Sequence, residues 1–419
     1  MAIDVSTGNN ANGVQSAKVK SIVIHTSTSL FLLSALYALY WTLKEYDWGE
    51  PYVKLLCFSI IFLLILVLQV FRRSTTVDTQ AFWLESAILT LVLISVVAVY
   101  ANRHGAGIFT KPVADIGFHT VDAAELLFVQ HKNPYSSRDL SPLTEYAPEF
   151  RGFYYGPFML VAYAPAVIFP DNGFKAASLF YVLLTAILAG WLVWNSGFTR
   201  NQGLAAILFV QTALFIPEKF WTEILSQGVT DIFPIMLVLA SLLFLNKGKY
   251  FWAAVFTGLS ISTKFAPALF LVPFLPWRSR GCRIGFLVGL IPLYPFLYWD
   301  FSGLFRNFFW MRFVMRPDST SLYTVLPVWL HWLMPVTLLS GFVLGLIWNY
   351  FRPIAYWPAT VCFTLLLIIA QLTAKEIHGN HLVWFFPLIA IIFTDGRERL
   401  ANFVSRILPF HPSEIAVDA

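Results

Sequence analysis

The sequence predicts an all-α integral membrane protein, built as a polytopic helical bundle. Of its 419 residues, 58% are hydrophobic and only 12% are charged, whereas a soluble domain is about a quarter charged. Aromatic residues make up 17% of the chain, and Trp and Tyr favour the boundary between membrane and water. Apolar runs approaching the roughly 20 residues that cross a bilayer recur along the chain. A water-soluble globular protein is therefore excluded.

About twelve apolar runs are candidate transmembrane helices. The polar residues 1–20 form a predicted cytoplasmic tail, and the run that follows is too long for a signal-peptide core and lacks a small-residue cleavage site. We expect N-terminal transmembrane helices over 21–100, a transmembrane core over 176–394 and a cytoplasmic tail over 395–419. The runs lie near 22–42, 52–71, 83–100, 176–195, 203–217, 231–246, 251–263, 266–277, 284–299, 325–349, 354–373 and 382–394.

The segment 153–169 is apolar but short, and prolines stand at its start and end. Counting it as a span would reverse the side of every later loop. Short cytoplasmic loops carry an excess of Lys and Arg, and this rule is met when 153–169 is a re-entrant or surface helix and the N-terminus is inside. The basic residues that then fall inside are Arg72, Arg73, Arg200, Lys247, Lys249, Arg278, Arg280, Arg283, Arg352, Arg397 and Arg399.

This topology gathers most of the notable polar residues on the extracytoplasmic face. The largest outer segment is predicted over 101–175, with an amphipathic and a re-entrant helix. Lys264 and Pro267 interrupt the apolar stretch 251–277, which favours two segments joined by an outward turn. The other outer segments are Glu218 to Asp231, Asp300 to Leu322 and Lys375 to His381.

The first outer segment contains a predicted amphipathic helix from Asp115 to Phe128. Its apolar residues recur at helical spacing, and such a helix would lie along the membrane surface. After this helix Asn133, Pro134 and Tyr135 turn the chain, because the residue before proline avoids the helical region. The apolar face is expected to comprise Phe118, Val121, Leu126 and Leu127.

Asp115 has two interpretations of similar weight. At the start of a helix, an Asp side chain commonly accepts backbone N–H groups as an N-cap. A carboxylate at the water boundary is also a candidate general base. Asp122 is a weaker candidate, and a solvated surface charge is the simpler interpretation of it.

Five pieces of the sequence, in order, resemble glycosyltransferase family 87, a family of the GT-C class of polytopic glycosyltransferases. Gly156 stands where the family usually has a proline, and the piece that ends at Asp231 has an altered order. The resemblance covers most of residues 110–395. The five pieces are Asp115 to Tyr135, Tyr154 to Phe158, Ser226 to Asp231, Gly258 to Pro267, and His378 to His381.

The resemblance implies sugar transfer from a polyprenyl-phosphate donor. An acid in the first outer loop, here Asp115, deprotonates the acceptor hydroxyl, and cations stabilise the charge that develops on the departing phosphate. Candidate donor-phosphate ligands are Lys264, His378, His381, Arg312 and Arg316. Candidate sugar or acceptor contacts are Asp122, Tyr155, Glu223, Gln227 and Asp231.

Each candidate has a structural alternative. Lys264 could snorkel to the interface, although ionisable groups at membrane depth are usually functional. Arg312 and Arg316 could be solvated loop residues. His378 and His381 could bind backbone carbonyls, and no third ligand accompanies them at metal-site spacing. Glu223 and Asp231 could be helix caps or loop charges. We expect no metal and no cofactor.

Other function classes are less well supported. The formal charge of +5 is small and no basic tract suggests nucleic acid. Phosphate-binding glycine motifs of nucleotide sites are absent from the sequence, which favours a lipid-linked donor. The partners expected are the donor, a lipid or glycan acceptor, and membrane lipids. A flippase or transporter of lipid-linked sugars is the main alternative, although its ionisable residues should lie near the bilayer midplane. A non-catalytic assembly factor is the third.

Overall fold

The computed structural model describes residues 115–136, 140, 152–169, 173–196, 200–215, 230–309, 326–351, 355–373 and 379–392. Every regular element within these ranges is a helix, and they contain no strand. The all-α prediction is therefore confirmed for this part of the chain. The three N-terminal spans and both predicted tails lie outside it.

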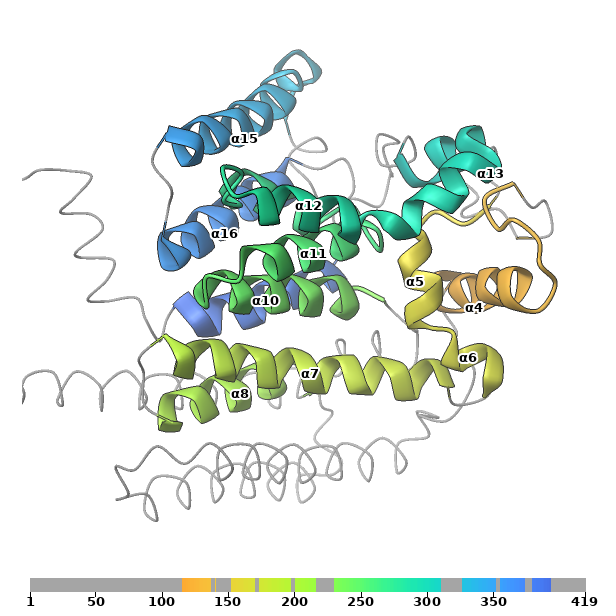
Figure 1. Ribbon diagram of the computed structural model, residues 1–419, viewed down its shortest axis with the longest axis horizontal. Coiled ribbons are helices and arrows are strands. Elements are labelled where there is room, and N and C mark those ends of the chain that lie inside the picture. The colour runs from red at the N-terminus through yellow and green to blue at the C-terminus, as the bar shows by residue number, and fades with distance from the viewer. Residues whose placement is uncertain are drawn as a thin grey trace, which may run out of the picture.

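Figure 1 shows the arrangement of the described elements. The first is α4, Asp115–Phe128, which has the bounds predicted from the sequence. The rest are α5 (Pro157–Ala162), α6 (Pro165–Ile168), α7 (Gly173–Asn195), α8 (Arg200–Phe215), α10 (Ile232–Asn246), α11 (Tyr250–Ile261), η2 (Ala268–Phe274), α12 (Arg280–Gly289), η3 (Ile291–Leu293), α13 (Tyr294–Leu304), η4 (Phe305–Phe309), η6 (Val328–Leu330), α15 (Leu333–Phe351), α16 (Tyr356–Leu372) and η7 (Gly379–Trp384).

Three helical stretches in the described residues are long and apolar enough to cross a membrane: Gly173–Asn195, Arg280–Phe309 and Val328–Phe351. Three shorter apolar helices, α10, α11 and α16, lie among them. The total of about twelve spans and the re-entrant position of 153–169 remain predictions. In that segment the structure has two short helices, α5 and α6, each of which begins at a proline.

Helix α10 forms the centre of the bundle, and nearly all of its residues are buried. It packs against α7, α11 and α16. Helices α11 and α12 pack closely, because small residues let their backbones approach. A Cβ atom on Gly289 would lie 2.8 Å from Cα of Gly258, and one on Gly285 would lie 2.2 Å from the Phe251 carbonyl oxygen. Gly285 and Gly289 are four residues apart, the small-xxx-small pattern of membrane helix pairs.

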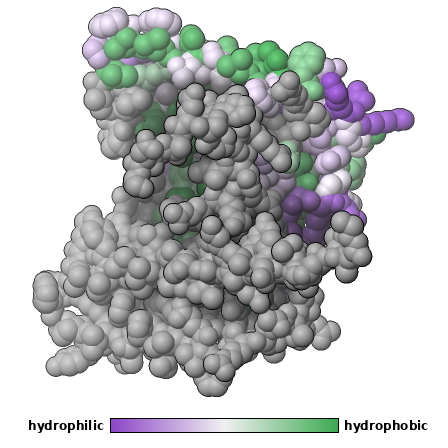
Figure 2. Space-filling model, turned by 90° about the vertical axis from the view of Figure 1, so that its left-hand side faces the viewer, coloured by the Kyte–Doolittle hydropathy of each residue, from purple (hydrophilic) through white to green (hydrophobic). Residues whose placement is uncertain are grey.

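The two ends of the bundle differ in character. At one end α4, α5, α6 and α13 gather, on the right of Figure 1. The opposite end has the turn between α10 and α11 and the start of α12. Figure 2 looks onto this second end, where hydrophilic residues collect at one edge and hydrophobic residues extend across the top. Of the polar candidates from the sequence, Tyr155, Asp231, Lys264 and His381 are buried, whereas Asp122 is exposed on α4.

Three local expectations differ from the structure. Residues 266–277 do not form a long helix, because Pro267 and Pro273 leave only the 3₁₀ turn η2. The helix expected to end near 299 continues to Phe309. Asp300 leaves helical geometry (φ −157°), but its carboxylate accepts the Gly303 N–H at 2.8 Å and the helix restarts. On α4, Phe118 is exposed, and the buried face consists mainly of His119, Thr120, Ala123, Ala124 and Leu126.

Candidate active site

Lys264 lies in a break between two helices. Helix α11 ends at Ile261, and the chain makes a last turn in which the Lys264 N–H donates to the Ser260 carbonyl at 3.0 Å. The 3₁₀ helix η2 does not begin until Ala268. The Lys264 side chain is nevertheless buried, with 5% of its surface exposed. A buried charge is costly unless it is paired, so its surroundings must compensate it.

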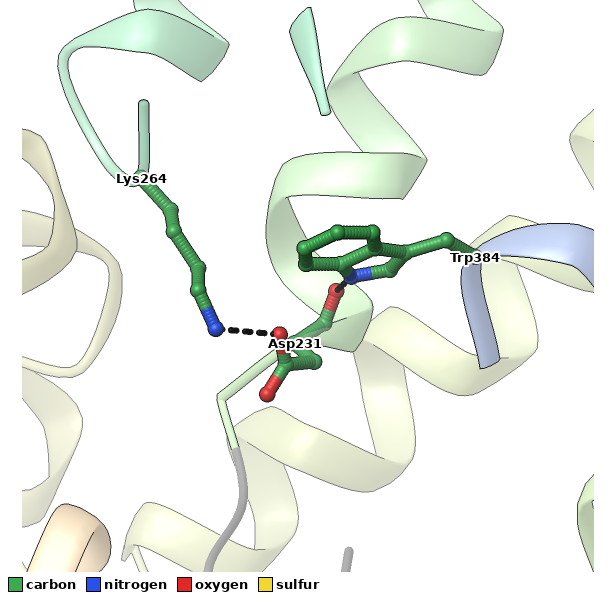
Figure 3. A network of polar contacts seen from close by, with 3 residues as sticks. All are labelled: Asp231, Lys264 and Trp384. Atoms are coloured by element: carbon green, nitrogen blue, oxygen red, sulfur yellow. Dashed lines mark hydrogen bonds and ion pairs between the residues drawn. The ribbon is translucent and has the colours of Figure 1, made fainter. Parts of the chain in front are cut away.

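Asp231 supplies that compensation (Figure 3). Its Oδ1 lies 2.5 Å from Nζ of Lys264, and the carboxylate is fully buried. Asp231 immediately precedes α10, and its side chain caps no backbone N–H there. Its backbone carbonyl accepts a hydrogen bond from Nε1 of Trp384 at 3.1 Å. Three segments distant in sequence therefore meet at this ion pair.

Two aromatic rings lie close to the lysine ammonium group. Nζ of Lys264 is 5.3 Å from the ring centre of Tyr155 and 5.2 Å from that of Trp384. Trp384 in turn stacks on His381 with ring centres 4.6 Å apart. Cation–π attraction at such distances is stronger in a desolvated site. The rings therefore hold the ammonium group in place while shielding it from water.

Tyr155 is positioned by close contact between two irregular segments. The Gly156 N–H donates to the Thr263 carbonyl at 2.7 Å, and the Phe158 N–H donates to the Ser262 carbonyl at 3.0 Å. A Cβ atom on Gly156 would lie 2.0 Å from the Ser262 oxygen. Glycine in place of the family's usual proline thus has a physical reason: proline has no N–H to donate, and no other side chain fits.

Tyr135 connects this site to the first outer segment. Its hydroxyl donates to the Tyr155 carbonyl at 2.6 Å, and its own carbonyl accepts from Nδ2 of Asn307 at 2.8 Å. Burial raises the pKa of the Tyr135 phenol well above its usual value, so the hydroxyl stays protonated as a donor. The Asn-Pro-Tyr turn after α4 is thereby fixed to both Tyr155 and η4.

Helix α4 approaches the same site through a second contact. His119 is buried and its ring centre lies 5.3 Å from that of Tyr154, which packs at 4.5 Å on Tyr155. Asp115 begins this helix, one turn before His119. The helix on which Asp115 stands is therefore part of the same end of the molecule as Lys264.

Residues 153–379 match the family model of glycosyltransferase family 87, which spans more than half of the chain. The chain belongs to glycosyltransferase family 87. The match includes Tyr155, Asp231 and Lys264, whereas α4 precedes it and His381 follows it by two residues. No curated protein and no solved structure matches the chain. Family membership makes this protein a membrane glycosyltransferase, which acts on a sugar donor and an acceptor.

The structure brings four of the candidate residues of this family 87 member together: Tyr155, Asp231, Lys264 and His381. Asp115 begins α4 nearby, and Asp122 is exposed on that helix. Five other candidates, Glu223, Gln227, Arg312, Arg316 and His378, lie outside the described residues.

Four residues of the site were not among the candidates from the sequence, although Tyr135 and Tyr154 belong to the pieces that resemble the family. They are Trp384, Tyr154, Tyr135 and Asn307. The spacing of three between His381 and Trp384 was a usable signal, because residues three apart stack on one side of a helical turn. The Asn307 contact spans 172 residues, and nothing in the local sequence could have indicated it.

The charges of the site determine how well it can bind an anion such as a phosphate. Lys264 and Asp231 form a pair with no net charge, so the pair by itself does not attract an anion strongly. An ammonium group can nevertheless donate to a carboxylate and to a phosphate oxygen at the same time. Because the pair is buried among aromatic rings, an added phosphate would interact with it in a medium of lower effective dielectric than water.

Proposed function

We propose that this family 87 glycosyltransferase moves a hexose, with mannose as the first candidate, from a polyprenyl-phosphate donor to a hydroxyl of a lipid or glycan on the extracytoplasmic face. The observation that carries the proposal is the buried Lys264–Asp231 pair beside Tyr155 and Trp384. Burying an ion pair costs several kcal/mol of desolvation free energy per ion. A buried pair in an apolar interior therefore needs a functional reason. A site that holds a phosphate leaving group supplies such a reason.

In the proposed reaction, Asp115 accepts the proton of the acceptor hydroxyl. The hydroxyl oxygen then bonds to the anomeric carbon of the sugar, and the bond from that carbon to the phosphate oxygen breaks. The polyprenyl phosphate leaves with the bonding electron pair and gains one unit of negative charge. Lys264 would stabilise this charge as it develops, which lowers the barrier more than ground-state binding would.

Because Asp231 already balances Lys264, a second cation is needed to balance the leaving group. His381 is the nearest described candidate, since it stacks on Trp384. Arg312 and Arg316 follow η4 in the sequence and are further candidates for this role. In this arrangement Asp231 holds Lys264 toward the donor, which differs from the direct sugar contact first expected for it.

The transporter alternative is not favoured. A transporter should place its ionisable groups near the bilayer midplane, in broken helices. Here Lys264 does lie in a break, but the break is at the end of the bundle next to α4 and α5. Family membership also indicates glycosyl transfer rather than translocation.

The test is a transfer assay in isolated membranes with a panel of radiolabelled polyprenyl-phosphate sugars. The wild-type chain should label a lipid or glycan product with one sugar of the panel. Asp115→Asn should remain membrane-inserted and lose transfer, because an amide cannot accept the proton; general-base loss typically costs about 100-fold to 10,000-fold. Glu125→Gln, which changes an exposed carboxylate on the same helix, is the matched control and should stay close to wild type. Wild-type transfer by Asp115→Asn would refute the assignment of the base.

A further inference from the structure

The end of the bundle opposite Lys264 carries a concentration of positive charge. Five exposed basic side chains lie there, and the chain contains no Asp or Glu between residues 231 and 300. None of the five forms an ion pair with a carboxylate in the part of the chain that the structure describes. The five are Lys247, Lys249, Arg278, Arg280 and Arg283; we name them the basic patch.

Packing between α11 and α12 brings the members of the basic patch close together. Cβ of Phe251, two residues after Lys249, would lie 3.7 Å from a Cβ atom on Gly281, the neighbour of Arg280. Two members are braced by aromatic rings: Lys247 lies 4.2 Å from the ring centre of Trp191, and Arg278 lies 5.0 Å from that of Tyr350. Like charges gathered at one end of the bundle repel one another, so an anion bound among them would relieve the repulsion.

A stripe of exposed apolar residues continues from the basic patch along α12 and η3. Ile284, Leu287 and Ile291 follow Arg280 at spacings of four, three and four residues, which places them on one side of the helical stretch. All three are exposed, Leu287 at 56%. The stripe continues through Tyr294 to Tyr298, which is 96% exposed at the far end. Along one side of the stretch Arg280–Phe309, basic side chains are thus followed by exposed aliphatic side chains and then by two tyrosines.

We propose that the basic patch and this stripe form a binding site for one anionic phospholipid. The phosphate would contact Lys249, Arg280 and Arg283, and an acyl chain would run along Ile284, Leu287 and Ile291. The basic patch followed by the apolar stripe matches the headgroup and the acyl chain of a phospholipid. Basic side chains at a membrane surface attract anionic headgroups, and exposed aliphatic side chains face acyl chains. A zwitterionic lipid lacks the net negative charge that would balance the basic patch. The site is independent of the proposed sugar transfer.

The test uses the full chain purified in detergent and titrated with phosphatidylglycerol or phosphatidylcholine, with bound lipid counted by native mass spectrometry. Phosphatidylglycerol should bind the wild-type chain more tightly. Each basic residue near a surface favours an anionic lipid by about fivefold, so the triple variant Lys249→Gln, Arg280→Gln, Arg283→Gln should lose affinity by about 100-fold. All three side chains are exposed, and Arg280→Gln alone should show a partial loss if the triple variant folds poorly.

Arg306→Gln is the matched control. Arg306 is also exposed, but it lies in η4 near the other end of the bundle. The Arg306→Gln variant should bind phosphatidylglycerol as tightly as the wild-type chain does. Equal binding of the two lipids by the wild type, or undiminished phosphatidylglycerol binding by the triple variant, would overturn the proposal. A loss as large in Arg306→Gln would overturn it too, because the preference would then reflect overall charge.

Discussion

At the scale of single residues, the pairing of Lys264 with Asp231 is the feature that most constrains function. Breaking a buried pair from one side leaves the other charge without compensation, at a cost of about 3–5 kcal/mol. Replacing both partners removes that penalty. The two side chains should therefore be strongly coupled in stability, and the pair should matter for turnover as well if the donor phosphate binds there.

We predict that Lys264→Ala lowers the melting temperature and reduces sugar transfer by at least about 100-fold, comparable to the loss of one transition-state donor. Lys264→Arg should not restore transfer, because a planar guanidinium differs in shape from the ammonium held between Tyr155 and Trp384. The double variant Lys264→Ala, Asp231→Ala should be more stable than Lys264→Ala alone. Transfer assays and thermal unfolding in detergent would measure both effects.

Lys247 provides a matched control for this prediction. It also lies over a Trp ring, at 4.2 Å, but it is exposed at the opposite end of the bundle. Lys247→Ala should change transfer little. If it lowered transfer as far as Lys264→Ala, the loss would reflect general damage to the bundle. Wild-type turnover by Lys264→Ala would reduce Lys264 to a structural anchor.

At the scale of elements, the active-site end depends on contact between two segments that are not helical. The residues before α5 and those after α11 form backbone hydrogen bonds, and Gly156 lies where they approach most closely. Tyr155 on one segment and Lys264 on the other are held together by this contact. A change that separates the segments should therefore alter the lysine environment without touching the lysine.

We predict that Gly156→Ala destabilises the protein by about 1–3 kcal/mol, the usual cost of overpacking, because its Cβ atom would lie 2.0 Å from a carbonyl oxygen. Sugar transfer should fall with it. Gly281→Ala is the control: its nearest neighbour would be 3.6 Å away, and Ala favours a helix interior over Gly. The changes in melting temperature that the two variants show relative to the wild type should differ in sign or clearly in size. Equal melting temperatures for Gly156→Ala and the wild type would mean that the two segments can separate freely.

At the scale of the whole molecule, sequence reasoning predicted the helical class, the family and the bounds of α4. It succeeded where the signals were local: the periodicity of α4, the turn at Pro134, and the charge of Lys264 within an apolar stretch. It could not pair Lys264 with Asp231, 33 residues away, or place Trp384 on the Asp231 carbonyl across 153 residues. Such contacts depend on how helices pack, which local pattern does not encode. The prediction that Phe118 lies on the buried face of α4 was wrong. Ala123 and Ala124 are buried there instead, because small residues allow closer packing than bulky residues do.

The orientation of the whole bundle is the last prediction, and it follows from the separation of its two ends. The basic patch lies at one end and the Lys264 site at the other, so the positive-inside rule predicts that the Lys264 site faces away from the cytoplasm. Single cysteines in place of Lys132, after α4, and Lys249, before α11, should report this in a background without the native cysteines. Both positions are exposed. An impermeant thiol reagent applied to intact cells should label position 132 directly and position 249 only after permeabilisation. The reverse pattern would place the site in the cytoplasm, where lipid-linked donors are not required, and labelling of both positions in intact cells would mean that the two ends do not lie on opposite sides of the membrane.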